Sequence, residues 1–208
     1  MRLEYALTVC DPRSLMVADI QASTSRSSGL SKADIMTALG YVQRQEHAGL
    51  ALLYAKYLKH DNEISYALDA LWQYSQTKHA SSNIKGRAIM RQLVALALFD
   101  YCRTPEDKGQ QCPACKGRKE VRDRKAEEQL YEICSKVVEL TKPCKRCHGT
   151  GLKALPKSNV VTIVQKMMPK ANERTIYRTW IPIYNELVQW CYTQEEEASR
   201  SYSRMVRM

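Results

Sequence analysis

The sequence lacks any long apolar run, and this absence excludes a large class of proteins. The longest unbroken apolar stretch, Leu93 to Phe99, is far shorter than the roughly 18 residues that a membrane-spanning helix needs. No secretory signal is visible, because Glu4 and Asp11 bracket the early apolar segment. We therefore expect no membrane association and a chain that stays in a reducing cytoplasm.

Motifs of catalytic sites are also missing. The four histidines are scattered along the chain, and no paired carboxylates, Ser-His-Asp arrangement or phosphate-binding loop stands out. A hydrophobic fraction of 44% and a charged fraction of 26% are ordinary for a globular protein and exclude a wholly disordered chain. Together these features predict a globular binding protein rather than an enzyme.

Positive charge is abundant and unevenly distributed. The chain has 32 Lys and Arg against 22 Asp and Glu, a formal net charge of +10. Residues 108–150 and 151–182 each carry a net charge of +5, so about a third of the chain holds the whole excess. Such clustering is typical of proteins that bind nucleic acid, although a solvated basic face would have the same composition.

Four of the eight cysteines form two pairs, Cys112-Pro-Ala-Cys115 and Cys144-Lys-Arg-Cys147, with 28 residues between them. Two residues between thiolates let both sulfurs of one turn bind the same ion, and two such turns complete a structural zinc site. Gly117 and Gly149 follow the pairs at the same distance, where a sharp turn brings backbone N–H groups towards the sulfurs. The predicted ligands of one structural Zn²⁺ ion are Cys112, Cys115, Cys144 and Cys147.

Other interpretations of the cysteine pairs fit less well. The second pair with His148 matches a haem-attachment pattern, but covalent attachment requires export, and a thioredoxin-like redox pair needs a βαβ context. A catalytic zinc ion would keep an open coordination position in a polar pocket. We expect His148 to support the site or contact a phosphate. The nearby Lys116, Lys145 and Arg146 are expected to favour thiolates.

A short break from Met168 to Asn172 separates the last two helical patterns and has the length of a helix-turn-helix connection. If Asn172 caps the second helix, the first turns of that helix would face base edges in a major groove, with nearby lysines on phosphates. An ordinary helical hairpin with a basic solvated face has the same pattern. The predicted DNA-contacting residues are Lys166, Lys170, Arg174, Thr175 and Arg178.

Apolar residues recur at helical spacing in six stretches, from residue 35 to residue 187. Pro182 lies inside the last stretch and should kink the helix or begin a new one. We therefore predict a mostly α fold: a helical bundle with a helix-turn-helix-like C-terminal part and an inserted four-cysteine zinc-binding module. The expected parts are a flexible N-terminal arm (1–30), a helical body (31–104), the zinc-binding insertion (105–151), a DNA-binding part (152–195) and a C-terminal tail (196–208).

Several segments carry a family resemblance. They are Cys112-Pro-Ala-Cys115-Lys-Gly, Cys144-Lys-Arg-Cys147-His-Gly-Thr-Gly151, Met168-Pro169, Tyr177-Arg-Thr-Trp-Ile-Pro-Ile-Tyr184, Met1-Arg-Leu-Glu4 and Phe99-Asp-Tyr-Cys-Arg103. Together these segments resemble the Q antitermination proteins of lambdoid phages, the phage lambda type in particular. The cysteine turns alone are not specific, because J-domain co-chaperones repeat C-x-x-C-x-G-x-G. Here the first turn ends in Lys119 instead of the second glycine, and no His-Pro-Asp is present.

The resemblance implies a late-gene transcription antiterminator in the cytoplasm of a bacterial host cell. Such proteins bind double-stranded DNA at a phage late promoter, engage paused host RNA polymerase with its sigma factor, and make it read through terminators. The zinc ligands carry over to the four paired cysteines, and the DNA-binding region carries over less securely to Lys170, Arg174, Thr175 and Arg178. Residues 122–140 and 35–60 are candidate polymerase contacts.

Two other functions stay open on the residues alone. A zinc-knuckle RNA-binding protein would prefer single-stranded RNA and stack aromatic side chains on bases, yet the cysteine turns contain no aromatic residue apart from the imidazole of His148. A zinc chaperone-like protein would need an exposed apolar groove rather than basic stretches. Binding to duplex DNA, single-stranded RNA and denatured protein distinguishes the three hypotheses.

Overall fold

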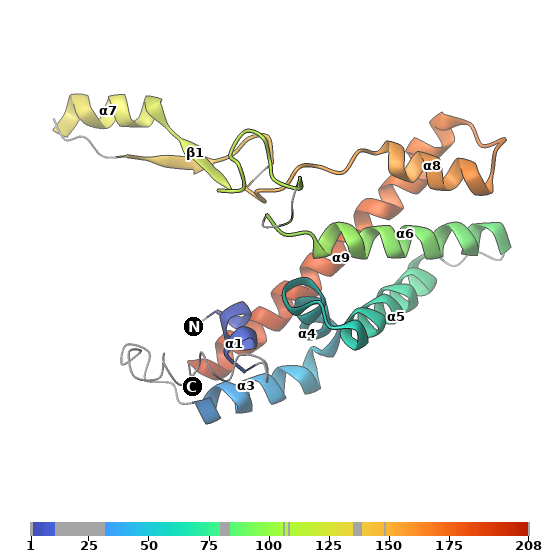
Figure 1. The fold of residues 1–208 in the computed structure, drawn as a ribbon, viewed down its shortest axis with the longest axis horizontal. Helices are drawn as coiled ribbons and strands as arrows, with labels where there is room; N and C mark the ends of the chain where they lie inside the picture. The colour runs from blue at the N-terminus through green and yellow to red at the C-terminus, as the bar shows by residue number, and fades with distance from the viewer. Residues whose placement is uncertain are drawn as a thin grey trace. The chain divides into compact units, whose positions relative to one another are not determined.

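The structure is a computed structural model, and it describes residues 2–10, 32–79, 84–105, 107, 109–134, 139–147 and 149–207. In this part of the chain, eight α-helices and one π-helical segment accompany a single pair of short strands (Figure 1). In chain order the elements are α1 (Leu3–Cys10), α3 (Lys32–Gln45), α4 (His47–Leu53), the π-helix η2 (Tyr54–Leu58), α5 (Asp61–Lys78), α6 (Ile84–Cys102), β1 (Glu120–Arg122), α7 (Arg124–Cys134), β2 (Thr141–Pro143), α8 (Ser158–Met167) and α9 (Glu173–Val206).

The mostly α fold with an inserted four-cysteine module is confirmed. The chain forms two compact units, which we name the helical unit (Met1–Cys102 with Lys157–Met208) and the cysteine unit (Arg103–Pro156). The cysteine unit follows α6 in the chain and precedes α8, so it interrupts the helical unit. None of the described helices has the length and apolar composition that crossing a bilayer requires.

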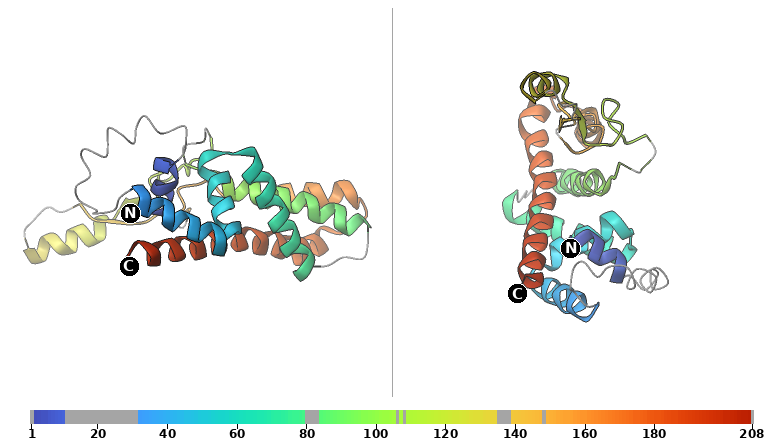
Figure 2. Two further views of the ribbon diagram at one scale, coloured as in Figure 1. Left: turned by 90° about the horizontal axis from the view of Figure 1, so that it is seen from below. Right: turned by 90° about the vertical axis from the view of Figure 1, so that its left-hand side faces the viewer.

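The long helix α9 runs the length of the helical unit, with other helices packed along it (Figure 2). Its N-terminal half contacts α5, α6 and α8. Apolar residues at helical spacing place Ile176, Leu187 and Cys191 on one fully buried face. This face packs with Leu71 of α5 and Leu93 of α6 in the larger of the two apolar cores. Full burial of each such aliphatic side chain stabilises the fold by about 1.5–3 kcal/mol.

The C-terminal half of α9 builds a second apolar core with α1, α3 and α4. Ala198 and Tyr202 of α9 are fully buried there, together with Leu7 of α1 and Val42 of α3. Residues 3–10 therefore form a packed helix, where the sequence led us to expect the start of a flexible arm over 1–30. The remaining parts of that expected arm that lie outside the described residues are residue 1 and residues 11–30.

The structure also differs from the sequence-based expectation at the C-terminal end. A separate charged tail was expected over residues 196–208, but α9 continues to Val206. The charged residues lie on the exposed face of this amphipathic helix, where Arg200 pairs with Glu196 at 2.6 Å. The apolar positions Ala198 and Tyr202 on the opposite face hold the segment in the second core.

Pro182 neither ends α9 nor begins a new helix. The helix runs unbroken from Glu173 to Val206, and Pro182 lies on its exposed side. A proline inside a helix lacks the N–H that would donate to the carbonyl of the residue four positions earlier, here Arg178. On the exposed side that carbonyl can be solvated, which lowers the cost of the missing hydrogen bond.

The three helices α6, α8 and α9 pack against one another at one end of the helical unit. The helix α8 ends at Met167, and Asn172 caps α9, as predicted: its side-chain oxygen accepts a hydrogen bond of 3.0 Å from the backbone N–H of Arg174. Capping by asparagine satisfies one of the orphan N–H groups of the first turn. The helix-turn-helix interpretation of this arrangement stays a prediction.

Gly49 lies where the backbones of α4 and α9 approach closely. A Cβ atom placed on Gly49 would collide with the backbone carbonyl of Gln194 and lie 2.9 Å from the Cβ of Ala198. Glycine is a poor helix former, so its presence in α4 is explained by this close backbone contact. Gly40 in α3, in contrast, has no heavy atom within 4 Å of the corresponding Cβ position.

These two glycines form a matched pair for a stability test. Gly49→Ala should lower the free energy of unfolding by about 1–3 kcal/mol, because the backbone of α9 must move to accept the methyl group. Gly40→Ala should raise it by about 0.5–1 kcal/mol, because alanine removes conformational freedom from the unfolded chain. Urea unfolding followed by circular dichroism measures both. Equal effects of the two substitutions would contradict the packing described for α4 and α9.

Candidate metal centre and nucleic-acid interface

An antiparallel hairpin brings the two distant cysteine pairs together in the cysteine unit. Strand β1 pairs with β2 so that Val121 lies opposite Lys142. Lys142 also forms an ion pair of 2.9 Å with Asp123, whose backbone N–H donates to the carbonyl of Leu140 at 2.7 Å. The helix α7 lies between these strands in the chain. Because the strands follow the first pair and precede the second, closing the hairpin sets the four cysteines side by side.

Each cysteine pair lies in a tight turn that contains residues with positive φ. In the first turn, the N–H of Lys116 donates to the carbonyl of Cys112 at 2.7 Å, and Lys116 and Gly117 have φ of 51° and 83°. In the second, Gly149 has φ of 82°. Glycine adopts this conformation without steric cost, which explains the glycine two residues after each pair. His148, next to the second pair, lies outside the described residues.

Two reciprocal hydrogen bonds join the turns. The N–H of Cys112 donates to the carbonyl of Gly151 at 2.8 Å, and the N–H of Cys144 donates to the carbonyl of Lys119 at 2.9 Å. Gly151 and Lys119 each stand four residues after the second cysteine of their own turn. The two turns are therefore related by an approximate twofold repeat of their backbone contacts, although their sequences differ.

Lys119 occupies the position that glycine takes in the other turn. Its φ of 69° matches the 78° of Gly151, so the backbone conformation is kept although the second glycine is absent from the first turn. A non-glycine residue in this region costs roughly 1–2 kcal/mol. Position 151 is less tolerant of a side chain, because a Cβ there would lie 2.8 Å from the carbonyl oxygen of Gly117.

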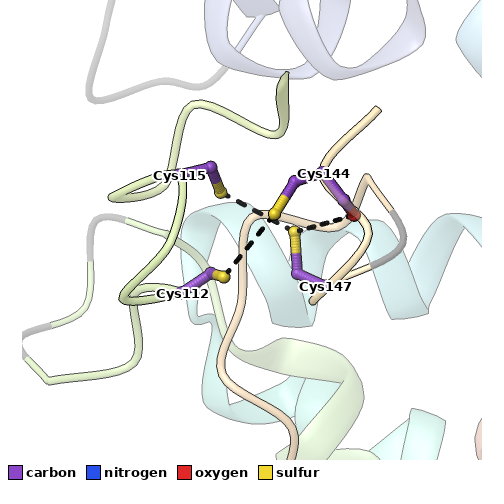
Figure 3. Close-up of side chains that lie close together, drawn as sticks. All are labelled: Cys112, Cys115, Cys144 and Cys147. Carbon is purple, nitrogen blue, oxygen red and sulfur yellow. Dashed lines mark hydrogen bonds between the residues drawn. The ribbon is translucent and has the colours of Figure 1, made fainter. Parts of the chain in front are cut away.

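The four sulfurs point towards one another at the centre of the two turns (Figure 3). All four side chains are buried, and all four Sγ atoms lie within 4.8 Å of one another. The Sγ atoms of Cys112 and Cys144 are 4.0 Å apart, and those of Cys115 and Cys147 are 3.7 Å apart. Tetrahedral zinc with Zn–S bonds of about 2.3 Å requires sulfurs about 3.8 Å apart. The donor set and its spacing therefore fit a tetrahedral metal ion.

Backbone groups tune the protonation of these thiols. Burial by itself raises the pKa of Cys147, but hydrogen bonds outweigh it and lower the pKa to about 7; the largest is from the N–H of Gly151, 3.3 Å from the sulfur. Burial raises the pKa of Cys115 to about 11. A cation at the centre of the sulfurs would favour the thiolate form of every one. The hydrogen bonds that lower the pKa of Cys147 come from the backbone N–H groups of Gly151 and Gly149 and from the side chains of Cys115 and Cys144.

Arg103, the first residue of the cysteine unit, is bonded to Lys153 near the end of that unit. The sequence alone did not assign this role. Its guanidinium is buried and donates to the side chain of Gln110 at 3.0 Å and to the carbonyl of Lys153 at 2.7 Å. The N–H of Lys153 in turn donates to the carbonyl of Gln110 at 2.7 Å. A buried arginine with these partners closes the base of the unit. A lone arginine in the sequence carries no signal for such a role.

The predicted DNA-contacting residues all lie in the helical unit, near the α8–α9 turn. Arg174 and Arg178 are four residues apart on α9, so their exposed side chains share a face. Ile176, between them in the sequence, is buried on the opposite side. The five candidates Lys166, Lys170, Arg174, Thr175 and Arg178 are exposed, and no ion pair with a described carboxylate holds any of them.

Comparisons with known proteins agree with one another. The family model for antitermination protein Q matches residues 108–199, which include most of the cysteine unit, α8 and most of α9. Over the whole of both chains, the sequence is 30% identical to antitermination protein Q of Escherichia phage lambda and 30% identical to that of Escherichia phage HK022. It is 29% identical, again over both full lengths, to antitermination protein Q of Salmonella phage P22.

Substitutions in the two turns test the reciprocal arrangement. Gly151→Ala should destabilise the cysteine unit by more than 1 kcal/mol, because it combines a strained positive φ with a clash against Gly117. Gly149→Ala should cost only the strained φ, about 1–2 kcal/mol, because the Cβ position there is open. Lys119→Gly should stabilise the unit by up to about 1 kcal/mol.

Denaturant unfolding of the full chain, followed by amide hydrogen exchange in the cysteine unit, measures these three effects. Equal losses for Gly149→Ala and Gly151→Ala would show that Gly117 does not crowd Gly151. A loss of stability in Lys119→Gly would contradict the strain described at that residue.

Proposed function

This chain belongs to the antitermination protein Q family, so its function is transcription antitermination of the phage type, and we propose that it acts by binding both DNA and RNA polymerase. In this proposal it binds duplex DNA at a phage late promoter, engages paused host RNA polymerase with its sigma factor, and makes the enzyme read through terminators. The observation that carries the proposal is the 30% identity over the full length of both chains to antitermination protein Q of phage lambda.

The helical end formed by α6, α8 and α9 supports the DNA-binding part of the proposal. Recognition helices place residues of their first turns against base edges in the major groove. The exposed first turns of α9 offer Arg174, Thr175 and Arg178, and arginine pairs bidentately with guanine. Lys166 and Lys170, at the end of α8 and in the turn, would contact phosphates on either side. Such contacts combine sequence preference with charge neutralisation.

The metal in this proposal is a structural zinc ion bound by the four clustered cysteines. Four buried thiolates without an open coordination position are typical of structural zinc. The ion would hold the two turns together, while the hydrogen bonds from backbone N–H groups orient the sulfurs. It would thereby stabilise the cysteine unit rather than take part in a reaction.

The contact with polymerase is proposed for surfaces that the protein leaves uncovered. The helix α7 packs extensively against no other described element, and Tyr131 on it is 55% exposed. The aromatic side chain on an unpacked amphipathic helix is typical of a protein contact. The stretch 35–60, in contrast, contributes Val42 and Leu53 to the second core and offers only its outer face.

A run-off transcription assay tests the proposed function. The template carries the phage's own late promoter followed by a terminator, and the reaction contains host RNA polymerase with its sigma factor, the purified protein and zinc. We expect the fraction of full-length transcript to rise with protein concentration. A template with an unrelated promoter is the control. Equal readthrough on both templates would exclude promoter-directed loading, and no readthrough on either would contradict the proposal.

Arg178→Ala tests the recognition helix directly. Loss of a bidentate contact with guanine should weaken binding to the promoter duplex by about 1–3 kcal/mol and relax the preference at one base pair. Arg204→Ala is the matched control, because Arg204 is an exposed arginine near the other end of the same helix. Fluorescence anisotropy with the promoter duplex and single-base variants measures both effects. If the two variants bind alike, the assignment of α9 as recognition helix is wrong.

Metal analysis tests the zinc site. Freshly purified protein should contain one zinc per chain, and Cys115→Ser should contain much less, because the serine hydroxyl is a poor zinc ligand. Cys102→Ser, which replaces a half-buried cysteine outside the cluster, should keep its metal. A chelator should abolish amide protection in the cysteine unit before the helical unit unfolds. Zinc-free native protein with an ordered cysteine unit would contradict the site.

A further inference from the structure

A basic hollow lies between α6 and the end of α8, within the helical unit. It has a volume of about 360 Å³, and its lining residues are Arg87, Ala88, Arg91, Gln92 and Met167. The two arginines are four residues apart on α6, so both guanidinium groups project from one face. The sequence analysis had not singled out either arginine.

Both arginines are available to an anionic ligand. They are exposed, and among the described residues no carboxylate forms an ion pair with either side chain. The guanidinium of Arg91 lies 5.2 Å from the ring centroid of Trp72, which holds it by a cation–π contact. This contact orders the side chain before any ligand binds, so less entropy is lost on binding.

The position of the hollow relates it to the α8–α9 turn. Met167, which lines it, is the last residue of α8, and Lys170 follows three residues later. A duplex whose major groove received the first turns of α9 would place its sugar-phosphate backbone along this turn. In that arrangement the hollow would face a phosphate of that backbone, and its volume of about 360 Å³ would admit a phosphodiester group with part of the adjoining sugar.

We propose that Arg87 and Arg91 of α6 form a phosphate clamp for the DNA backbone beside the recognition helix. This inference rests on the proposed DNA binding and extends the contact surface to a third helix. The planar fork of arginine donates two parallel hydrogen bonds to phosphate oxygens. Such a clamp sets the position of the protein on the duplex without reading the base sequence.

Arg87→Gln and Arg91→Gln test the clamp by fluorescence anisotropy with the late-promoter duplex. Each substitution should weaken binding roughly tenfold, as expected for loss of hydrogen bonds to a charged group. Each should also make the slope of log K against log salt about 0.9 less steep. Binding to single-base variants of the site should weaken by the same factor, because a phosphate contact carries no base preference.

Matched variants separate the clamp from other effects. Arg204→Gln, an exposed arginine far along α9, should keep wild-type affinity and salt slope. Arg91→Lys keeps the charge but loses the planar fork, so its affinity should lie between those of wild type and Arg91→Gln. The thermal unfolding midpoint of each variant is measured alongside, and a variant folded as wild type with full affinity would overturn the clamp.

Duplexes with single methylphosphonate substitutions locate the contacted phosphate. At one backbone position, neutralising the phosphate should weaken binding of the wild-type protein but leave binding of Arg91→Gln unchanged. Additive losses at every position would overturn the clamp. Arg178→Ala separates failure of the clamp from failure of DNA binding as a whole. If it loses affinity while the α6 variants do not, the clamp fails and DNA binding by α9 stands. If none of the variants loses affinity, the DNA-binding proposal itself fails.

Discussion

The amphipathic helix α9 contributes its apolar face to both apolar cores, and the helical unit depends on the burial of this face. Its N-terminal half buries Ile176 and Leu187 against α5, α6 and α8, and its C-terminal half buries Tyr202 against α1, α3 and α4. The two cores are thus coupled through a rigid rod. The exposed arginines at the start of α9 are presented by a helix that the whole helical unit holds in place, not by a loop.

The cysteine unit is a long insertion between α6 and α8, which pack against each other in the helical unit. Bringing the two ends of such an insertion together costs conformational entropy, and contacts between those ends offset that cost. Arg103 supplies one of these contacts by bonding Gln110 and the carbonyl of Lys153. The clustered sulfurs and the reciprocal backbone bonds supply the others. The insertion therefore forms a compact unit with its own interior.

The sequence predicted the features that rest on local patterns, and missed those that rest on distant contacts. Helical periodicity, the Asn172 cap and the spacing of the cysteines are local, and the structure confirms the fold and the sulfur cluster that they indicate. The burial of Leu3, Leu7, Ala198 and Tyr202 could not be read locally, because each apolar stripe needs the other to complete a core. The roles of Gly49 and Arg103 likewise appear only when their distant partners are known.

The pairing of β1 with β2 has a consequence for how this family can vary. The hairpin is closed by the bond between Asp123 and Leu140, and α7 lies beyond that bond, away from the sulfur-bearing turns. Within α7, Glu127 also helps to close the hairpin, because it accepts hydrogen bonds from Arg122 and from the backbone N–H of Leu140. The donor geometry is therefore insulated only from the part of the connection beyond Glu127. That outer part can change, and with it the protein surface it offers, while the four clustered cysteines and the helical unit keep their form.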